Sequence, residues 1–275
     1  MDKKPLVSVI TVCYNSEKHI RDTIESVLNQ TYDNIEYILV DGKSLDKTLD
    51  IIKEYEPKFN GKMRCFSEPD DGIYDAMNKG IDLANGEIIG IINSDDWYEL
   101  YTVEKVVNEF EKTDVEVVYG DLYKIIPGFS EKYIHTGDLS NKKISKIQFN
   151  HPTFFVKKSI YEKLGKFDTR YPVSADLDLT IRFLYNNVIF SRIPMVLANF
   201  RLGGVTSEKN MTFRLRWLVS KYNILKNNKV PFFETNHIIF NIFIATLRDY
   251  IILKLLGRKV FLSLRKFRYR YFGPP

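Results

Sequence analysis

The hydrophobic positions of the first 120 residues alternate between short unbroken apolar runs and stretches with helical spacing. The run Val7–Tyr14 is rich in β-branched residues, as strands are, and Glu17–Asn29 after it places its apolar residues on one helical face. Two further pairs of the same kind follow, Ile35–Val40 with Leu45–Tyr55 and Met63–Ser67 with Ile73–Leu83. Strands that alternate with helices favour parallel pairing through right-handed crossovers. The pattern therefore predicts an α/β fold with a doubly wound, mostly parallel sheet that is covered by helices on both faces.

The strand that we expect to carry the chemistry is the apolar run Ile88–Ile92, which leads into Asn93-Ser94-Asp95-Asp96. Such a run is typical of a strand buried on both faces of a parallel sheet, and ligands of open α/β sheets bind beyond the carboxyl ends of the strands. Two neighbouring carboxylates repel each other there, and a divalent cation shared with substrate phosphates would relieve the repulsion. A helix cap explains the pair equally well, because Asp caps helices and Tyr101–Lys112 has helical spacing.

A further carboxylate, Asp41, ends the predicted strand Ile35–Val40 and precedes Gly42, where the backbone must turn closely. A carboxylate only accepts hydrogen bonds, so at a ligand site it would select a base that offers an imide N–H, such as uracil, thymine or guanine. The alternative interpretation is a turn-forming residue ahead of Ser44 and Asp46. The stretch by itself favours neither interpretation.

The segment Glu68–Gly80 is dense in polar residues for one that also begins a helix. Asp70 and Asp71 favour the amino end of a helix, and this interaction with the helix dipole explains at least one of them. Asp75, Asn78 and Lys79 lie on the following turns, and this excess of polar residues indicates ligand contacts. The residues of this segment that we expect at the ligand are Asp70, Asn78 and Lys79.

After Gly120 the regular alternation of strands and helices ends. Short antiparallel strands are predicted at Tyr123–Ile126 and Tyr133–Thr136, and a strand entered through a turn is predicted at His151–Val156. A single histidine is more often structural than catalytic, although His151 is expected on the same side of the fold as the site.

The helix that we expect to begin at Ser174 carries two acidic residues in its first turn, Asp176 and Asp178. Capping explains both of them. The functional alternative is a general base, because a carboxylate at a helix end beside a sugar site can take a proton from an attacking hydroxyl. Farther along the chain, Arg201 belongs to a Gly-rich stretch, Phe200–Ser207, that is suited to folding over phosphates.

The net charge of +5 is distributed unevenly along the 275 residues. Residues 241–275 hold eight Lys or Arg against one Asp, a net charge of +7 that leaves −2 for the rest of the chain. The uncharged stretch Thr235–Leu247 is too short to span a bilayer, and aromatic residues are interspersed among the cations after it. We expect amphipathic helices here that lie on an anionic membrane leaflet, with a hairpin packed on its own domain as the alternative. The segment is too aliphatic for a nucleic-acid-binding arm, so no nucleic-acid partner is expected.

The two cysteines, Cys13 and Cys65, lie in predicted strands and lack the spacing of metal ligands. Two buried thiols fit a reducing compartment. The first residues, Met1–Pro5, are polar, so no signal peptide is expected. These features and the basic tail predict a cytoplasmic protein that is peripheral at the inner face of the cell membrane.

Five segments, in the expected order, resemble the family 2 glycosyltransferases with the GT-A nucleotide-sugar fold. They are Val9–Ser16, Asp41–Thr48, Glu68–Gly80, Asn93–Asp96 and Ser174–Leu179, and the similarity covers about residues 5–207. The resemblance implies a GT-A (Rossmann-like) domain at 1–207, followed at 208–275 by a C-terminal helical membrane-associating extension. It also implies that the nucleoside is held by Thr11, Tyr14 and Asp41, with Asp41 on the base.

The resemblance further implies roles for the acidic residues at the strand and helix ends. Asp95 and Asp96 match the family's Asp-x-Asp element, in which the last carboxylate usually carries Mg²⁺ or Mn²⁺ and its neighbour lies near the ribose. Asp176 falls where the family keeps its catalytic base. With the polar residues chosen above, the expected nucleotide-sugar contacts are Thr11, Tyr14, Asp41, Asp70, Asn78, Lys79, Asp95 and Arg201, and the expected metal ligands are Asp96 and Asp95.

Three positions depart from the family pattern. They are Asn93 where many members have Asp, Ala175 where a Glu often precedes the base, and Lys43 where the residue is usually small. These departures leave open which carboxylate of the pair meets the metal and whether Asp176 or Asp178 is the base.

The expected function is that of an inverting glycosyltransferase. It would move a sugar from a nucleoside diphosphate sugar, with a UDP-sugar preferred, to a hydroxyl of a saccharide acceptor, and a lipid-linked acceptor in surface polysaccharide or O-antigen synthesis is expected. One alternative is a catalytically inactive sugar- or membrane-binding scaffold. A nucleotidyltransferase would need a Gly-rich basic loop, whereas Ser8–Ser16 contains neither Gly nor Lys. A glycosidase would not need a nucleotide site.

Overall fold

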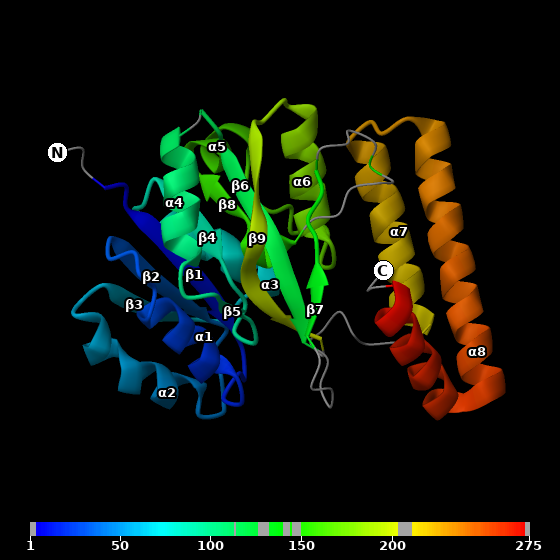
Figure 1. Ribbon diagram of the computed structural model, residues 1–275, viewed down its shortest axis with the longest axis horizontal. Helices are drawn as coiled ribbons and strands as arrows, with labels where there is room; N and C mark the ends of the chain where they lie inside the picture. Colours follow the sequence, from blue (N-terminus) through cyan, green and yellow to red (C-terminus); the bar gives the residue numbers. More distant parts are fainter. Residues whose placement is uncertain are drawn as a thin grey trace.

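A computed structural model describes residues 4–112, 114–125, 132–139, 144, 150–202 and 211–272. At its centre is one mixed sheet with the strand order β3-β2-β1-β4-β8-β6-β9-β5, in which β7 also pairs with β6 (Figure 1). The described strands are β1 (Val7–Cys13), β2 (Ile35–Asp41), β3 (Met63–Ser67), β4 (Ile88–Ile91), β5 (Trp97–Tyr98), β6 (Val117–Ile125), β7 (Lys132–His135), β8 (Phe155–Lys157) and β9 (Phe190–Arg201). The described helices are α1 (Ile20–Leu28), α2 (Thr48–Tyr55), α3 (Ile73–Leu83), α4 (Thr102–Lys112), α5 (Lys158–Leu164), α6 (Ala175–Tyr185), α7 (Met211–Asn227) and α8 (Phe232–Phe272), with 3-10 turns η1 (Glu56–Phe59) and η3 (His151–Thr153).

The first half of the sheet has the parallel arrangement that the sequence predicts. β1 pairs in parallel with β2 and with β4, and β2 pairs in parallel with β3. The register sets Cys13 opposite Asp41 and Asp41 opposite Ser67, so these strands end level with one another. The loops that follow them therefore meet at one edge of the sheet.

The second half of the sheet is mixed. β8 is antiparallel to β4, so the central apolar strand has a parallel neighbour on one side only. β6 and β7 form the expected antiparallel pair. The strand predicted from His151 begins later, at Phe155, because His151-Pro152-Thr153 forms the turn η3 and Pro152 has no N–H to donate to a ladder.

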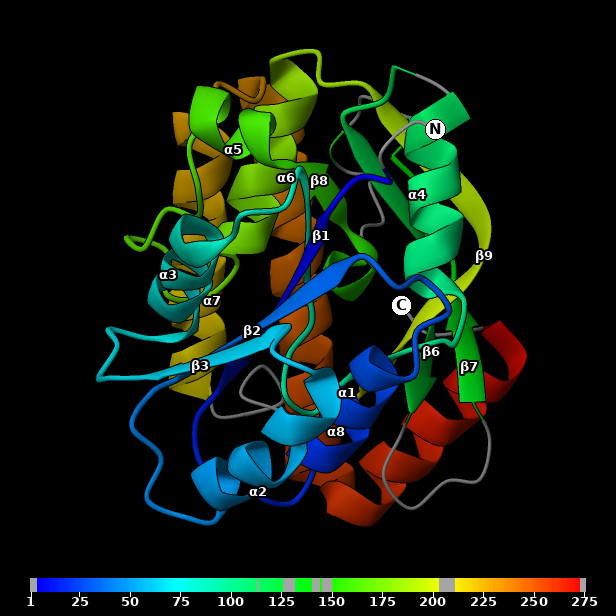
Figure 2. The ribbon, with the colours of Figure 1, turned by 90° about the vertical axis from the view of Figure 1, so that its left-hand side faces the viewer.

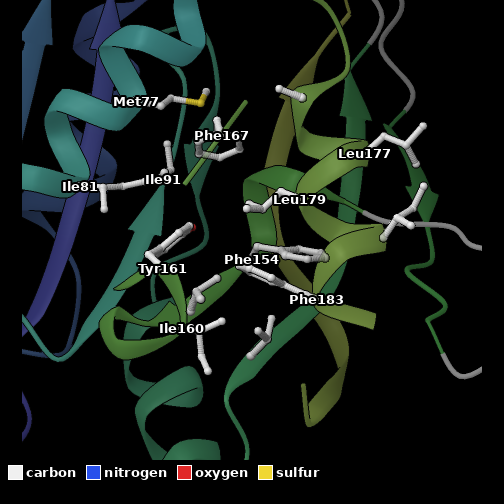
Figure 3. Packing of buried hydrophobic residues seen from close by; sticks show 14 of the residues in the cluster. Met77, Ile81, Ile91, Phe154, Ile160, Tyr161, Phe167, Leu177, Leu179 and Phe183 are labelled. Carbon is white, nitrogen blue, oxygen red and sulfur yellow. The ribbon is translucent and has the colours of Figure 1, made fainter. Parts of the chain in front are cut away.

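The two faces of the sheet carry separate apolar cores, because successive strand residues point to opposite sides. Val7 and Val9 pack with α1, α2 and α4, whereas Ile10 and Val12 pack with α3, α5 and α6. Figure 2 shows these two helical layers on either side of the strands. In Figure 3, side chains of α3, α5 and α6 meet over β4, where Ile91 lies.

The C-terminal helices α7 and α8 lie side by side along the α6 side of the domain (Figure 1). Ile224 and Leu225 of α7 have no exposed surface, and both join the core of the α3, α5 and α6 layer together with Ile238 of α8. α7 and the start of α8 thus pack on their own domain, and the expected membrane contact of the rest of α8 stays a prediction. No helix within the described ranges is both long enough and apolar enough to cross a membrane.

The two cysteines differ in their surroundings. Cys13 is buried in β1, as predicted. Cys65 is exposed, and the prediction of a buried thiol at this position is wrong. The physical reason is that β3 stands at the end of the strand order, so it has a neighbouring strand on one side only.

Candidate active site

Asp41 ends β2 with no exposed surface, and donors from the protein surround its carboxylate. Ser44 donates its hydroxyl at 2.5 Å and its backbone N–H at 3.0 Å, and the Ser67 hydroxyl donates at 2.7 Å. The Cys13 thiol lies at 3.6 Å. These contacts favour the turn-forming interpretation of Asp41, and its selection of a base stays a prediction.

Gly42 is the point where two loops approach most closely. A Cβ atom at this position would lie 2.5 Å from Oδ2 of Asp70 and 3.4 Å from the ring of Tyr14. The other oxygen of Asp70 accepts the backbone N–H of Gly72 at 2.9 Å, just before α3. Tyr14 is 60% exposed. The structure therefore brings together Tyr14, Asp41 and Asp70, three of the residues expected at the nucleotide.

Hydrogen bonds tie together the loops that follow β1, β2 and β4. The hydroxyls of Ser16 and Ser94 are 2.8 Å apart, and the backbone N–H of Ser16 donates to the Thr48 hydroxyl at 2.7 Å. The backbone N–H of Asn15 donates to the Ser44 hydroxyl at 2.8 Å. The carboxyl edge of the sheet is thus a fixed rim, in which residues far apart in sequence have set positions.

Asp95 and Asp96 follow β4 at this rim, and α4 begins only after the intervening β5, so neither is its cap. Asp96 has no exposed surface; its Oδ1 accepts the backbone N–H of Arg201 at 2.9 Å. Among the described residues, Asp96 Oδ2 and the side-chain oxygen of Asn93 are buried without a hydrogen-bond partner. Burial and the neighbouring Asp95 hold the pKa of Asp96 well above its usual range, and burial raises the pKa of Asp95 as well.

A divalent cation fits this pair of carboxylates. An orphaned carboxylate oxygen in a buried position needs a positive partner, and Mg²⁺ is commonly held by one or two carboxylates together with substrate phosphates. In the part of the chain that the structure describes, no group of three or more His, Cys, Asp or Glu side chains is arranged to hold a metal ion by itself. The other oxygen atoms around a cation at Asp95 and Asp96 would therefore come from substrate phosphates or from water.

The Arg201 side chain lies beside this pair at the end of β9. Its guanidinium donates to Asp22 at 2.7 Å, contacts Nδ1 of His19, and stacks over the ring of Trp97 with 4.9 Å to the ring centroid. Burial and the Arg201 charge lower the pKa of His19. Sequence reasoning missed His19 and Asp22, because nothing near them in the sequence indicates a partner beyond position 200. The Gly-rich residues after Leu202 lie outside the described residues.

Two residues expected at the nucleotide are used elsewhere in the fold. Thr11 has no exposed surface, and its hydroxyl accepts a hydrogen bond from the Tyr37 hydroxyl at 3.0 Å. The amide of Asn78 makes two hydrogen bonds to the backbone of Phe167, at 2.9 and 3.0 Å. Thr11 thus packs in the core and Asn78 fixes the loop before α6, and the nucleotide contacts expected of both stay predictions.

Lys79 is also occupied within the fold. Its ammonium donates to the backbone oxygen of Pro69 at 2.8 Å and forms ion pairs with Glu68 at 3.0 Å and Asp75 at 3.3 Å. An ammonium has three donors, and these contacts use all of them. Lys79 therefore ties the segment before α3 to that helix, and its expected contact with the ligand stays a prediction.

Asp176 lies in the first turn of α6, which Ser174 begins in a left-handed conformation with φ 74°. Its Oδ1 accepts the backbone N–H of Leu177 at 2.9 Å and the hydroxyl of Tyr74 at 3.2 Å. Tyr74 belongs to the first turn of α3, which follows the carboxyl end of β3. Asp176 therefore lies at the same edge of the sheet as Asp41 and Asp70, and it is partly exposed.

Asp178 has a different environment from Asp176. It is 5% exposed, one carboxylate oxygen pairs with Arg182 at 2.9 Å, and the other accepts the Asn228 amide at 2.7 Å. Arg182 also donates to three backbone carbonyls, those of Leu164, Gly165 and Lys166. Both oxygens of Asp178 are thus used to hold α6, and the geometry favours Asp176 as the carboxylate that is available to a substrate.

His151 lies on the site side of the fold, as expected. Its ring is 5.5 Å from the Phe167 ring, and Phe167 stacks on Tyr74, the residue that donates to Asp176. Burial lowers the pKa of His151, and the Asp176 charge opposes this effect. His151 is thus a structural neighbour of the carboxylate in this arrangement.

The sequence matches the family model described as "Glycosyl transferase family 2" over residues 8–165. A "PGL/p-HBAD biosynthesis glycosyltransferase" of Mycobacterium bovis is 31% identical over 209 residues, which cover 74% of this chain and 80% of that protein. "Glycosyltransferase GlyG" of Streptococcus pneumoniae is 30% identical over 233 residues, 77% of this chain and 75% of that protein.

Solved structures with the same fold include two that hold nucleotide sugars. S. aureus TarS in complex with UDP-GlcNAc has a TM-score of 0.66 and 19% identity, covering 86% of this chain and 71% of that one. The chain covers 43% of a longer TarS structure. The mannosyltransferase PcManGT from Pyrobaculum calidifontis in complex with GDP-Man and Mn²⁺ has a TM-score of 0.65 and 16% identity, covering 99% of this chain and 84% of that one. The chain therefore belongs to glycosyltransferase family 2 and has the GT-A fold.

Proposed function

We propose that this glycosyltransferase moves a sugar from a nucleoside diphosphate sugar, preferably a UDP-sugar, to a hydroxyl of a saccharide acceptor with inversion at the anomeric carbon. The proposal rests on one observation: the acidic residues at the carboxyl edge of the sheet differ in their hydrogen-bond partners and in their exposure. Asp96, beside Asp95, has a buried carboxylate oxygen without a hydrogen-bond partner among the described residues. Asp176 is partly exposed and accepts both of its side-chain hydrogen bonds on a single oxygen.

The proposed chemistry is a single displacement. Asp176 takes the proton of the acceptor hydroxyl while that oxygen attacks the anomeric carbon, and the nucleoside diphosphate leaves from the opposite face. The Tyr74 hydroxyl holds the orientation of Asp176, and the Arg201 guanidinium supplies positive charge near the leaving diphosphate. Asp95 and Asp96 would hold Mg²⁺ or Mn²⁺, which when bound offsets the charge that grows on the diphosphate.

Solved neighbours of this fold support a nucleotide-sugar donor. One is in complex with UDP-GlcNAc and another with GDP-Man and Mn²⁺, so both donor classes and the metal deserve testing. In this chain, Tyr14, Asp41 and Asp70 surround Gly42 and form the proposed nucleoside rim. The preference for uracil rests on the carboxylate of Asp41, which would have to release one of its present donors to meet an imide N–H.

We also propose that the C-terminal hairpin docks on an anionic membrane surface at the cytoplasmic face. One side of α8 exposes large apolar side chains, each between 40% and 61% exposed: Phe240, Phe243, Ile244, Leu247 and Ile251. Eight Lys or Arg residues occur between 241 and 275. Apolar side chains with nearby cations favour the interface of an anionic leaflet. Such docking suits a lipid-linked acceptor in surface polysaccharide or O-antigen synthesis.

The donor experiment uses the full chain. UDP- and GDP-sugars would be screened for binding and for slow hydrolysis by water, with Mg²⁺, with Mn²⁺ and with a chelator. We expect one UDP-sugar to bind and to be hydrolysed in a metal-dependent manner, and Asp176→Asn to remove hydrolysis while UDP still binds. Equal loss of hydrolysis and UDP binding in that variant would assign Asp176 to binding. If no nucleotide sugar binds, the proposed activity is wrong.

The membrane proposal has its own experiment. Co-sedimentation with vesicles that contain anionic lipid should fall about tenfold in the double variant Phe240→Ser, Leu247→Ser, because each side chain loses its burial in the interface. The matched control is Leu45→Ser, which replaces an exposed leucine, 85% accessible, in the loop before α2. Equal sedimentation of the double variant and the wild type would contradict docking through this face.

A further inference from the structure

Helix α7 packs on the segment that carries Asp176. The indole N–H of Trp217 donates to the Ser174 hydroxyl at 2.9 Å, and the Ser220 hydroxyl donates to the backbone oxygen of Val173 at 3.2 Å. The middle of α7 is thus tied to the residues just before α6. Just beyond the carboxyl end of α7, Asn228 holds Asp178, as described above. The carboxyl-terminal half of the helix therefore spans the first turn of α6, with Asp176 between its two points of attachment.

Lys221 lies on the same face of α7 as these contacts. It follows Trp217 by four residues, and side chains at this spacing are neighbours on a helix. Its ammonium is 4.8 Å from the centroid of the Trp217 ring, on one face of the indole. Burial lowers the pKa of Lys221, and the charge of Asp176 opposes this effect, so the two groups interact electrostatically.

The Lys221 ammonium has no hydrogen-bond acceptor or direct ion pair among the residues that the structure describes. Its observed neighbours are an aromatic face and, beyond direct contact, the Asp176 carboxylate. A partly buried ammonium has three donors, and leaving them unpaired is unfavourable. The ring of Trp217 offsets part of this cost but accepts no conventional hydrogen bond. An anionic oxygen from a ligand would satisfy the group.

We propose that Lys221 and Trp217 of α7 form an anion subsite for the acceptor, in which Lys221 binds a phosphate oxygen and so directs an acceptor hydroxyl toward Asp176. The inference rests on the proposed transferase function and adds the chemical class of the acceptor. It differs from the donor site, whose phosphates belong beside Asp95 and Asp96. It also makes the C-terminal hairpin part of the acceptor site.

The experiment measures anion binding while the donor site is filled. Full-length protein is saturated with UDP and Mg²⁺, and inorganic pyrophosphate and geranyl diphosphate are titrated at constant ionic strength set with chloride. The variants are Lys221→Met, Lys221→Arg and the matched control Lys226→Met, which removes an exposed lysine from the same helix. The melting temperature with UDP shows whether each variant is folded.

We expect Lys221→Met to weaken binding of both probes at least tenfold, the loss that follows when a charge-assisted hydrogen bond is removed. Lys221→Arg should keep most of the affinity, and Lys226→Met should equal the wild type. Tighter binding of geranyl diphosphate than pyrophosphate would identify a lipid-borne phosphate, and equal binding a soluble one. Both results support the subsite when they depend on Lys221.

Several outcomes would overturn the subsite. One is probe binding by Lys221→Met that equals the wild type, and another is no probe binding by the UDP-saturated wild type. A third is a loss of probe affinity in Lys226→Met that equals the loss in Lys221→Met, because the effect would then come from the net charge of the protein and not from a site at Lys221. If Lys221→Met does not fold, wild-type affinity in Lys221→Gln decides against the proposal. Failure of the wild type to bind UDP would instead contradict the proposed function, since that measurement does not depend on Lys221.

Discussion

The two acidic residues in the first turn of α6 should respond to the same substitution in opposite ways. Asp176→Asn keeps an oxygen that can accept from the Leu177 N–H and the Tyr74 hydroxyl, so the local hydrogen bonds survive. Asp178→Asn cannot keep both contacts of the carboxylate. One oxygen of Asp178 accepts a hydrogen bond from Arg182, and the other accepts one from the amide of Asn228. An amide has one accepting oxygen, so its NH₂ group would face one of these donors.

The magnitudes follow from burial and from the partners. Asp178 is 5% exposed, and breaking a buried ion pair typically costs about 3–5 kcal/mol. Arg182 would still donate to three backbone carbonyl oxygens. We therefore expect a loss of stability at the lower end of this range, about 3 kcal/mol, which corresponds to a fall of about 6–10 °C in melting temperature. Asp176→Asn should change stability by less than about 1 kcal/mol, whereas losing a general base should slow transfer by about 10²–10⁴.

The assay compares both variants for melting temperature, UDP affinity and hydrolysis or transfer of the preferred donor. Asp178→Asn should melt early and, at a temperature where it is folded, keep much of its activity. The reasoning is refuted if Asp178→Asn is inactive at an unchanged melting temperature. It is also refuted if Asp176→Asn transfers sugar at the wild-type rate, because the carboxylate would then not be the base.

Local patterns predicted the scaffold well because the scaffold depends on periodicity. Ile73–Leu83 forms α3 with the predicted bounds, and the apolar run from Ile88 forms β4. The carboxylates at the strand ends reach one rim because the register of parallel strands sets where each strand stops. A strand was also expected within His151–Val156, where β8 begins at Phe155, but its antiparallel pairing with β4 left no signal, because a local pattern does not report the neighbouring strand.

Polar residues were harder to assign, because their partners come from distant parts of the chain. Asn78 looked free to bind a ligand, yet its amide is occupied by the backbone of Phe167, 89 residues away. Arg201 meets Asp22 across 179 residues. No local pattern reports such a contact. The choice between Asp176 and Asp178 also required a partner from outside the segment, the amide of Asn228.

Three more results are expected. Gly42→Ala should leave the melting temperature nearly unchanged. The new methyl group would meet the Asp70 carboxylate at 2.5 Å, and that carboxylate can rotate away. Calorimetry should nevertheless show weaker UDP binding, because the rim around position 42 is altered. Tyr74→Phe should lower kcat for donor hydrolysis about tenfold without changing UDP affinity, since Asp176 loses the hydroxyl that orients it. Cys65 is an exposed residue, but partial desolvation of its thiol and the charge of Asp41 raise the pKa of that thiol to about 11. Only the thiolate reacts, so labelling by a disulfide reagent should be slow at pH 8 and should quicken about tenfold per pH unit until the pH approaches 11.

Hydrogen-bond partners, and not burial alone, distinguish the carboxylates of this site that are already paired within the protein from those that are not. Asp41 and Asp96 both have no exposed surface, but Asp41 has donors around both oxygens, whereas Asp96 keeps one oxygen without a partner in the described chain. Asp178 is nearly as buried and fully paired. A buried acceptor without a partner is costly, so a fold retains it only where something else supplies the missing charge or donor. The same reasoning applies to the Lys221 ammonium, which lacks an acceptor among the described residues. For this reason the carboxylate pair and that lysine are the two places where we expect phosphate to bind.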